Sequence, residues 1–138
     1  LWTVEHGARG GDEINIPEAG LNYGWPVISY GRQYSGAPIG EGTSRPGMEQ
    51  PVYYWDPVIA PSGMVFYRGA MFPELEGDAL IGGLQAGAVV RLRIKGDRVS
   101  GEQRLLEGIG RVRDIELAPD GALLILTDGG ELIRLARG

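Results

Sequence analysis

The chain has 138 residues, of which 43% are hydrophobic and 22% charged, a composition typical of a folded domain with a real core. Its formal net charge is −5 without a basic cluster, which argues against nucleic acid and an anionic membrane surface as partners. No apolar run reaches the roughly 18 residues that a membrane span needs. The absence of cysteine excludes a disulfide framework and thiolate chemistry.

Glycine and proline punctuate the whole chain. The 24 glycines and 9 prolines fall between short apolar runs, and no window shows a helical period. In chain order the predicted strands are Leu1–Val4, Glu13–Ile16, Val27–Tyr30, Val52–Trp55, Met64–Tyr67, Ala79–Gly83, Val89–Ile94, Gln103–Leu106, Val112–Leu117, Leu123–Thr127 and Leu132–Leu135. Residues 31–51 are the exception, a long Gly/Pro/Ser-rich loop of the kind that is usually functional or mobile.

A repeat organises these strands. The stretch Gly77–Ile94 resembles Asp120–Arg137, and matched leucines and arginines lie 43 positions apart. A period of roughly 40–45 residues built from short strands predicts the blades of a β-propeller. We therefore expect an all-β fold of antiparallel blades.

About three such blades fit in the chain, whereas propellers close with about 4–8. We therefore expect the C-terminal part of a longer propeller, which needs the remaining blades for closure. Within it we expect residues 1–30 to form a blade end with a Gly-rich site loop, 31–51 the long loop, and 52–110 and 111–138 one blade each.

The segment Glu5–Pro26 combines glycines with oxygen-bearing side chains. Glu13 and Tyr23 lie ten residues apart in it. A hard cation such as Ca²⁺ takes carboxylate and backbone carbonyl ligands, and glycines let the backbone approach it. The alternative is that Asp12 and Glu13 are exposed acids at a strand end, beside a packed Asn–Tyr–Gly–Trp turn. The one histidine, His6, is a candidate base or a structural side chain, and a His-based metal site is excluded.

Arg111 and Arg113 flank Val112 at the start of a predicted strand. Side chains at i and i+2 point to the same side, and two guanidinium groups on one face suit a carboxylate or phosphate. The alternative is a pair of solvated charges that are neutralised by Asp114 or Glu116. Further along, the aromatic residues Trp25, Tyr53, Tyr54 and Trp55 suit either ligand stacking or core packing.

Four stretches carry a family resemblance: "EHGARGGDEINIPEAGLNYGWPVISYG", "APSGMVFY", "ALIGGLQAGAVVRL" and "GRVRDIELAPDGALLILTD". In this order, and over essentially the whole chain, they resemble the soluble quinoprotein sugar dehydrogenases, in particular the aldose sugar dehydrogenase branch. Members of this family are six-bladed β-propellers that oxidise aldoses with pyrroloquinoline quinone (PQQ) and Ca²⁺. The resemblance implies the C-terminal part of such an enzyme, located in the periplasm or secreted.

The resemblance also implies metal ligands. Glu13 and Tyr23 match ligands of a structural Ca²⁺. The backbone carbonyls of Gly7 and Ala8 match those that hold the Ca²⁺ in contact with the quinone. Ala8 stands where a proline is common, a change that a backbone ligand survives.

For the cofactor, Tyr34 matches a tyrosine that contacts PQQ, and Arg111 and Arg113 match an arginine pair that faces it, as suits a tricarboxylate. Gln85 stands where the family often has a lysine that polarises the quinone, so quinone activation is expected to be weaker or differently arranged. The family's catalytic histidine lies upstream of the resembled segment and is not His6. No catalytic base is therefore expected in this chain.

Two other functions stay open. A Ca²⁺-dependent lactone hydrolase also uses a propeller, although it needs several side-chain oxygens converging on one ion. A non-catalytic binding propeller would retain the fold without the chemistry, and Gln85 in place of lysine keeps this alternative in play.

Overall fold

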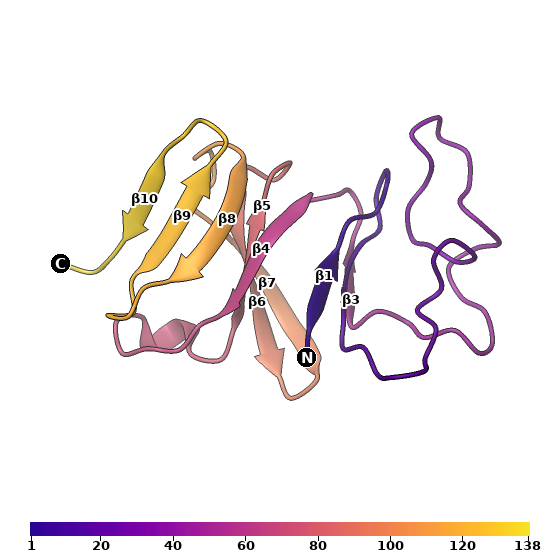
Figure 1. Ribbon diagram of the computed structural model, residues 1–138, viewed down its shortest axis with the longest axis horizontal. Coiled ribbons are helices and arrows are strands. Elements are labelled where there is room, and N and C mark those ends of the chain that lie inside the picture. Colours follow the sequence, from indigo (N-terminus) through magenta and orange to yellow (C-terminus); the bar gives the residue numbers. More distant parts are fainter. The chain divides into compact units, whose positions relative to one another are not determined.

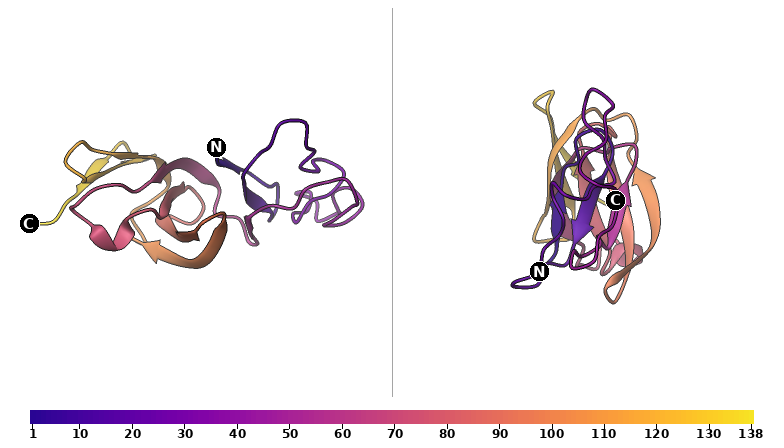
Figure 2. Two further views of the ribbon diagram at one scale, coloured as in Figure 1. Left: turned by 90° about the horizontal axis from the view of Figure 1, so that it is seen from below. Right: turned by 90° about the vertical axis from the view of Figure 1, so that its right-hand side faces the viewer.

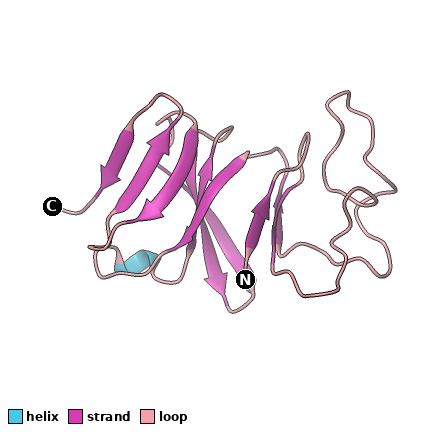
Figure 3. Cartoon of the chain, viewed as in Figure 1, coloured by secondary structure: helices cyan, strands magenta, loops and turns pink.

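The computed structural model describes residues 1–138 and consists almost entirely of β-strands (Figures 1 and 3). The strands are β1 (Thr3–Glu5), β2 (Asp12–Asn15), β3 (Tyr53–Trp55), β4 (Pro61–Phe66), β5 (Ala79–Gly83), β6 (Ala88–Lys95), β7 (Arg98–Leu105), β8 (Val112–Leu117), β9 (Leu123–Thr127) and β10 (Leu132–Leu135). The single helical element is one turn of 3₁₀ helix, η1 (Pro73–Leu75). Nothing helical in the chain has the length and apolar character to cross a membrane.

The strands form three antiparallel sheets, in the orders β1-β2-β3, β4-β5-β6-β7 and β10-β9-β8 (Figure 1). The chain divides into two compact units, residues 1–60 with the first sheet and residues 61–138 with the other two. Three separate antiparallel sheets confirm the expected all-β partial propeller. The strand β3 pairs with β2, so it belongs to the first sheet, although the sequence grouped residues 52–110 as one blade.

Most predicted strands are present, and four of them have the predicted bounds: β5, β8, β9 and β10. The predicted strand Val27–Tyr30 is wrong. The N–H groups of Val27 and Ile28 both donate to the carbonyl of Gly24, at 2.6 and 3.0 Å, and wind the chain into a turn. Gly24 has φ +99°, and a Cβ there would lie 2.2 Å from Ile28 Cγ1, so only glycine allows this packing.

Residues 31–51 contain no strand and only isolated bridges, Arg9 with Arg32 and Arg32 with Pro38. Figure 2 shows from two further sides that the purple segment between β2 and β3 runs as irregular loop. The first unit therefore holds a small sheet in which one long loop joins β2 to β3.

The repeated stretches form equivalent hairpins, β5–β6 and β9–β10, with a difference in register. Leu80 faces Arg91 in the first hairpin, whereas Leu123 faces Leu135 in the second. With the same register, Leu123 would face Arg134, the counterpart of Arg91. It faces the next residue instead, because the turn of the second hairpin is one residue shorter.

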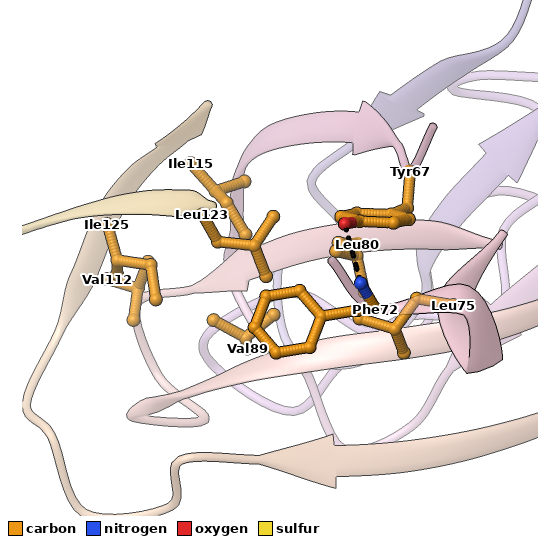
Figure 4. Close-up of a cluster of buried hydrophobic side chains, with 9 residues drawn as sticks. All are labelled: Tyr67, Phe72, Leu75, Leu80, Val89, Val112, Ile115, Leu123 and Ile125. Atoms are coloured by element: carbon orange, nitrogen blue, oxygen red, sulfur yellow. Dashed lines mark hydrogen bonds between the residues drawn. The ribbon is translucent and has the colours of Figure 1, made fainter. Parts of the chain in front are cut away.

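The core of the second unit draws side chains from both of its sheets (Figure 4). Burying each aliphatic or aromatic side chain is worth roughly 1.5–3 kcal/mol. The Tyr67 hydroxyl is satisfied inside this core, since it donates to the Gly121 carbonyl at 2.8 Å and accepts the Phe72 N–H at 3.0 Å. The buried core residues are Tyr67, Phe72, Leu75, Leu80, Val89, Val112, Ile115, Leu123 and Ile125.

The repeated arginines are both held by aspartates of their own hairpin regions. Arg91 is buried and its Nε and Nη2 lie 2.7 Å from Asp78 Oδ2. Arg134 forms an exposed pair with Asp120. These ion pairs give the repeated arginines a structural role.

Candidate functional site

Asp12 is a structural residue in the candidate metal loop, not an exposed acid. Its side chain is fully buried. Oδ1 accepts the N–H of Gly7 at 2.7 Å, and Oδ2 accepts the N–H groups of Ile59 and Ala60, each at 2.8 Å. Because both oxygens are used by backbone donors, Asp12 fixes the Gly-rich loop and is not a free metal ligand.

Glu13 faces Glu5 directly across the β1–β2 ladder. Burial raises the pKa of Glu13 above its ordinary value; the hydrogen bond from Asn15 opposes this shift and the charge of Glu5 adds to it. The amide Nδ2 of Asn15 donates to Glu5 Oε1 at 2.6 Å and reaches Glu13 Oε2 at 3.4 Å. Asn15 Oδ1 is buried without any hydrogen-bond partner. Two carboxylates and an unpaired amide oxygen thus gather at one end of the sheet.

Tyr23 has its hydroxyl committed elsewhere. The hydroxyl donates to the Ile16 carbonyl at 3.0 Å and accepts the Glu18 N–H at 2.9 Å. The backbone carbonyl of Tyr23, in contrast, accepts no backbone N–H. A cation at this residue would therefore be bound through the carbonyl, a choice that the sequence left open.

A cavity of about 340 Å³ brings three of the four metal candidates together, namely Gly7, Glu13 and Tyr23. Glu5 also lines it. The fourth metal candidate, Ala8, lines a second, more apolar hollow of about 550 Å³ together with Tyr34.

Both hollows share the exposed ring of Trp25 as a wall. Tyr34 is 81% exposed on the second of them, so its ring is available to a ligand. The first unit therefore places the candidate metal ligands and the candidate quinone-contacting tyrosine on neighbouring hollows.

In the second unit, Arg111 and Arg113 meet on one carboxylate, that of Asp128. Arg111 Nε donates to Oδ2 at 3.0 Å; Arg113 Nε donates to Oδ1 at 2.7 Å and its Nη2 to Oδ2 at 3.2 Å. About half of each arginine side chain is exposed. The two guanidinium groups thus lie on one face, as predicted, but their partner is neither Asp114 nor Glu116.

A β-bulge, rather than simple strand alternation, produces this arrangement. Val112 pairs with Thr127 and Asp114 pairs with Leu126, so Arg113 is an extra residue in β8. Bulges redirect side chains at strand ends. The Asp114 carboxylate is meanwhile occupied by the N–H of Ile115 at 2.9 Å.

The contact between Arg113 and Asp128 favours the charged form of each. The hydrogen bond from Arg113, followed by that from Arg111, holds the pKa of Asp128 below its ordinary value of 3.8. The same contact raises the pKa of Arg113. Two positive groups and one negative group leave one positive charge for a further anion.

Gln85 lies exposed in the turn that joins β5 to β6. The Gly87 carbonyl of this turn accepts the N–H of Gly108 at 3.0 Å, and the Arg111 carbonyl accepts the N–H of Asp128 at 2.9 Å. The short segment from Gly108 to Arg111 therefore connects the two hairpin turns. It places the turn of Gln85 near the arginine pair.

Sequence reasoning missed Asp12, Asn15 and Asp128. The partners of Asp12 lie up to 48 positions away, and Asp128 follows Arg111 by 17 positions. A signal for Asp128 was available in the repeat, because Asp128 lies 43 positions after Gln85, at the corresponding turn.

Comparisons with known proteins match the chain along nearly its whole length. The family model for glucose / sorbosone dehydrogenase covers residues 1–134. The chain is 46% identical to aldose sugar dehydrogenase YliI of Escherichia coli, over 99% of this chain and 38% of that protein. It is 42% identical to the uncharacterized protein slr1608 of Synechocystis, over 98% of this chain and 34% of that protein. The chain thus spans little more than a third of the length of these relatives.

Solved structures give the same result. A crystal structure of glucose dehydrogenase matches with a TM-score of 0.95 and 46% identity, over 99% of this chain and 41% of that one. The apo form of the soluble aldose sugar dehydrogenase of Escherichia coli matches with a TM-score of 0.91 and 46% identity, over 96% and 40%. The PQQ-bound form of an aldose sugar dehydrogenase from Streptomyces coelicolor matches with a TM-score of 0.71 and 27% identity, over 98% and 38%.

Proposed function

Because this chain belongs to the glucose / sorbosone dehydrogenase family, we propose that it works as part of a PQQ- and Ca²⁺-dependent aldose dehydrogenase. In this proposal further blades complete the propeller and supply the catalytic histidine. The full-length protein is this chain together with those blades. Its substrate is an aldose sugar, and its location is the periplasm or the extracellular space.

The observation that carries the proposal is the arginine pair at the start of β8. Arg111 and Arg113 share one carboxylate and keep one net positive charge on a half-exposed face. A planar tricarboxylate such as PQQ suits guanidinium groups, which bind carboxylates through two parallel N–H donors. Of the other quinone candidates, Gln85 would donate a hydrogen bond and Tyr34 would contact the ring.

The residues around Glu13 fit a hard cation. Glu5 and Glu13 face each other across the ladder, and the Asn15 amide N–H₂ reaches an oxygen of each. The unpartnered Asn15 Oδ1 and the free Tyr23 carbonyl are further oxygen donors of the kind that Ca²⁺ takes. In the proposal Glu13 and the Tyr23 carbonyl hold a structural Ca²⁺.

The second Ca²⁺ of the proposal uses backbone groups. The carbonyls of Gly7 and Ala8 accept no backbone N–H, and the N–H of Gly7 is fixed by buried Asp12. A Cβ at Gly7 would lie 2.0 Å from the Gly10 carbonyl oxygen, so the loop has room only for glycine here. A rigid loop with free carbonyls suits a backbone-ligated cation.

The roles of this chain's residues are binding and orientation. When bound, PQQ would supply the redox chemistry of sugar oxidation. Arg111 and Arg113 would anchor its carboxylates and stabilise negative charge on the bound quinone. Gln85 would donate a hydrogen bond to the quinone but lacks the charge with which a lysine would polarise it more strongly. The exposed ring of Trp25 would form part of an aromatic rim.

Reconstitution tests the proposal. The full-length protein is stripped with a chelator and then given PQQ, Ca²⁺, an aldose and a redox dye. We expect dye reduction that requires the aldose, the quinone and the metal together. Lactone hydrolysis without quinone would instead identify a propeller hydrolase, and the absence of both activities would identify a non-catalytic binding propeller.

A further inference from the structure

Asp128 is fixed by the backbone as well as by its two ion pairs. It opens the three-residue turn Asp128–Gly130 between β9 and β10, in which Gly130 N–H donates to the Thr127 carbonyl at 3.0 Å. Gly130 has φ +85°, the left-handed conformation that such a turn requires. The Asp128 N–H also donates to the Arg111 carbonyl at 2.9 Å. The carboxylate is therefore held beside the start of β8.

The carboxylate takes both arginines by their Nε edges. Arg111 uses Nε alone, and Arg113 uses Nε with Nη2. A guanidinium group carries five N–H donors in one plane. Because neither arginine has another hydrogen-bond partner, most of their terminal N–H groups remain available at the exposed ends of the side chains.

The charge balance separates this trio from an ordinary surface ion pair. Asp120 at the other end of β9 pairs with Arg134 alone, one charge against one. Asp128 has two arginines to satisfy, and two like charges would move apart without it. The arrangement leaves an anion-binding surface whose geometry depends on one carboxylate.

We propose that Asp128 is a positioning residue for quinone binding. It holds the guanidinium groups of Arg111 and Arg113 together in one orientation, with their terminal N–H groups open to a carboxylate of a planar anionic ligand. This inference rests on the proposed function, because PQQ is the ligand that the arginines receive there. Asp128 acts through the arginines and takes no part in proton transfer.

The test is the affinity of the full-length protein for PQQ, titrated in Ca²⁺ and followed by quenching of protein fluorescence. Removing a negative charge beside a trianionic ligand strengthens binding if charge alone matters. If Asp128 positions the arginines, removing it weakens PQQ binding instead. We expect Asp128→Ala to weaken PQQ binding about tenfold, the size of a coupling between neighbouring residues. Asp128→Asn, which keeps one acceptor oxygen, falls between Asp128→Ala and the wild type.

Two controls isolate the effect. Asp120→Ala breaks an exposed ion pair of the same kind and should leave PQQ affinity within about twofold of the wild type. In an Arg111→Ala, Arg113→Ala background, Asp128→Ala should not weaken PQQ binding further, because the groups that it positions are gone. Melting temperatures of all variants verify that each is folded.

The outcomes are distinct. Tighter or unchanged PQQ binding by Asp128→Ala overturns the positioning role and leaves the proposed function intact. An equal loss in the double-arginine background also overturns it, because Asp128 would then act without the arginines. If the wild type itself does not bind PQQ, the proposed function fails, and the positioning role in quinone binding fails with it.

Discussion

Asp12 offers the sharpest test of how the candidate metal loop is held. Its buried carboxylate accepts three backbone N–H groups, from Gly7, Ile59 and Ala60, at 2.7–2.8 Å. A hydrogen bond to a charged group contributes roughly 1.5–3 kcal/mol, and a buried donor left without a partner costs roughly 1–3 kcal/mol. Asp12→Ala should therefore destabilise the first unit by about 3–5 kcal/mol, and Asp12→Asn, which keeps one acceptor, by about half as much.

Amide hydrogen exchange of the full-length protein measures this locally. A loss of about 3–5 kcal/mol corresponds to exchange at Ile59 and Ala60 that is faster by roughly two to four orders of magnitude. Asp97→Asn is the control, since Asp97 is an exposed acid in the β6–β7 turn that makes no hydrogen bond with its side chain. Exchange at those two amides that rises less than about fivefold in Asp12→Ala would refute the reasoning.

Three further predictions concern the metal loop and the buried ion pair. Glu13→Gln should raise the melting temperature in chelator, because it removes a half-buried charge that faces another carboxylate. It should also abolish most of the rise in melting temperature that Ca²⁺ causes, whereas the control Glu18→Gln should keep that rise. Tyr23→Phe should cost about 0.5–1.5 kcal/mol for each lost hydrogen bond yet retain the Ca²⁺-induced gain, and loss of that gain would show that the hydroxyl is a ligand. Asp78→Asn should cost about 3–5 kcal/mol in urea unfolding, because Arg91 stays buried without its counter-charge; a loss below about 1 kcal/mol would contradict this.

Much of the fold was predictable because its signals are local. Hairpins such as β9–β10 consist of short apolar runs on either side of a glycine turn, and both of these strands have the bounds that the sequence predicted. The error at Val27–Tyr30 is also local in cause. A glycine three residues earlier lets the chain turn back on itself, and an apolar run of four cannot reveal that.

The candidate site was predictable only in part. The arginine pair was visible as two like residues two positions apart. The bulge at Arg113, however, changes the pairing between β8 and β9, and it leaves no pattern in the sequence. Asp12 and Asp128 were not identified because their partners come from distant segments, which only the folded chain brings together. In both cases the missed residue supports a group that the sequence had already indicated.

The affinity of the full-length protein for PQQ, compared between the wild type and Arg111→Ala, tests the proposed quinone site most directly. In excess Ca²⁺ we expect the substitution to raise the Kd for PQQ about ten- to a hundredfold, because it removes a charge-assisted contact to a carboxylate. Arg111→Lys should restore only part of the affinity, since lysine lacks the planar fork of N–H donors. A Kd for Arg111→Ala within about twofold of the wild-type value would contradict a role for the arginine pair in holding the quinone.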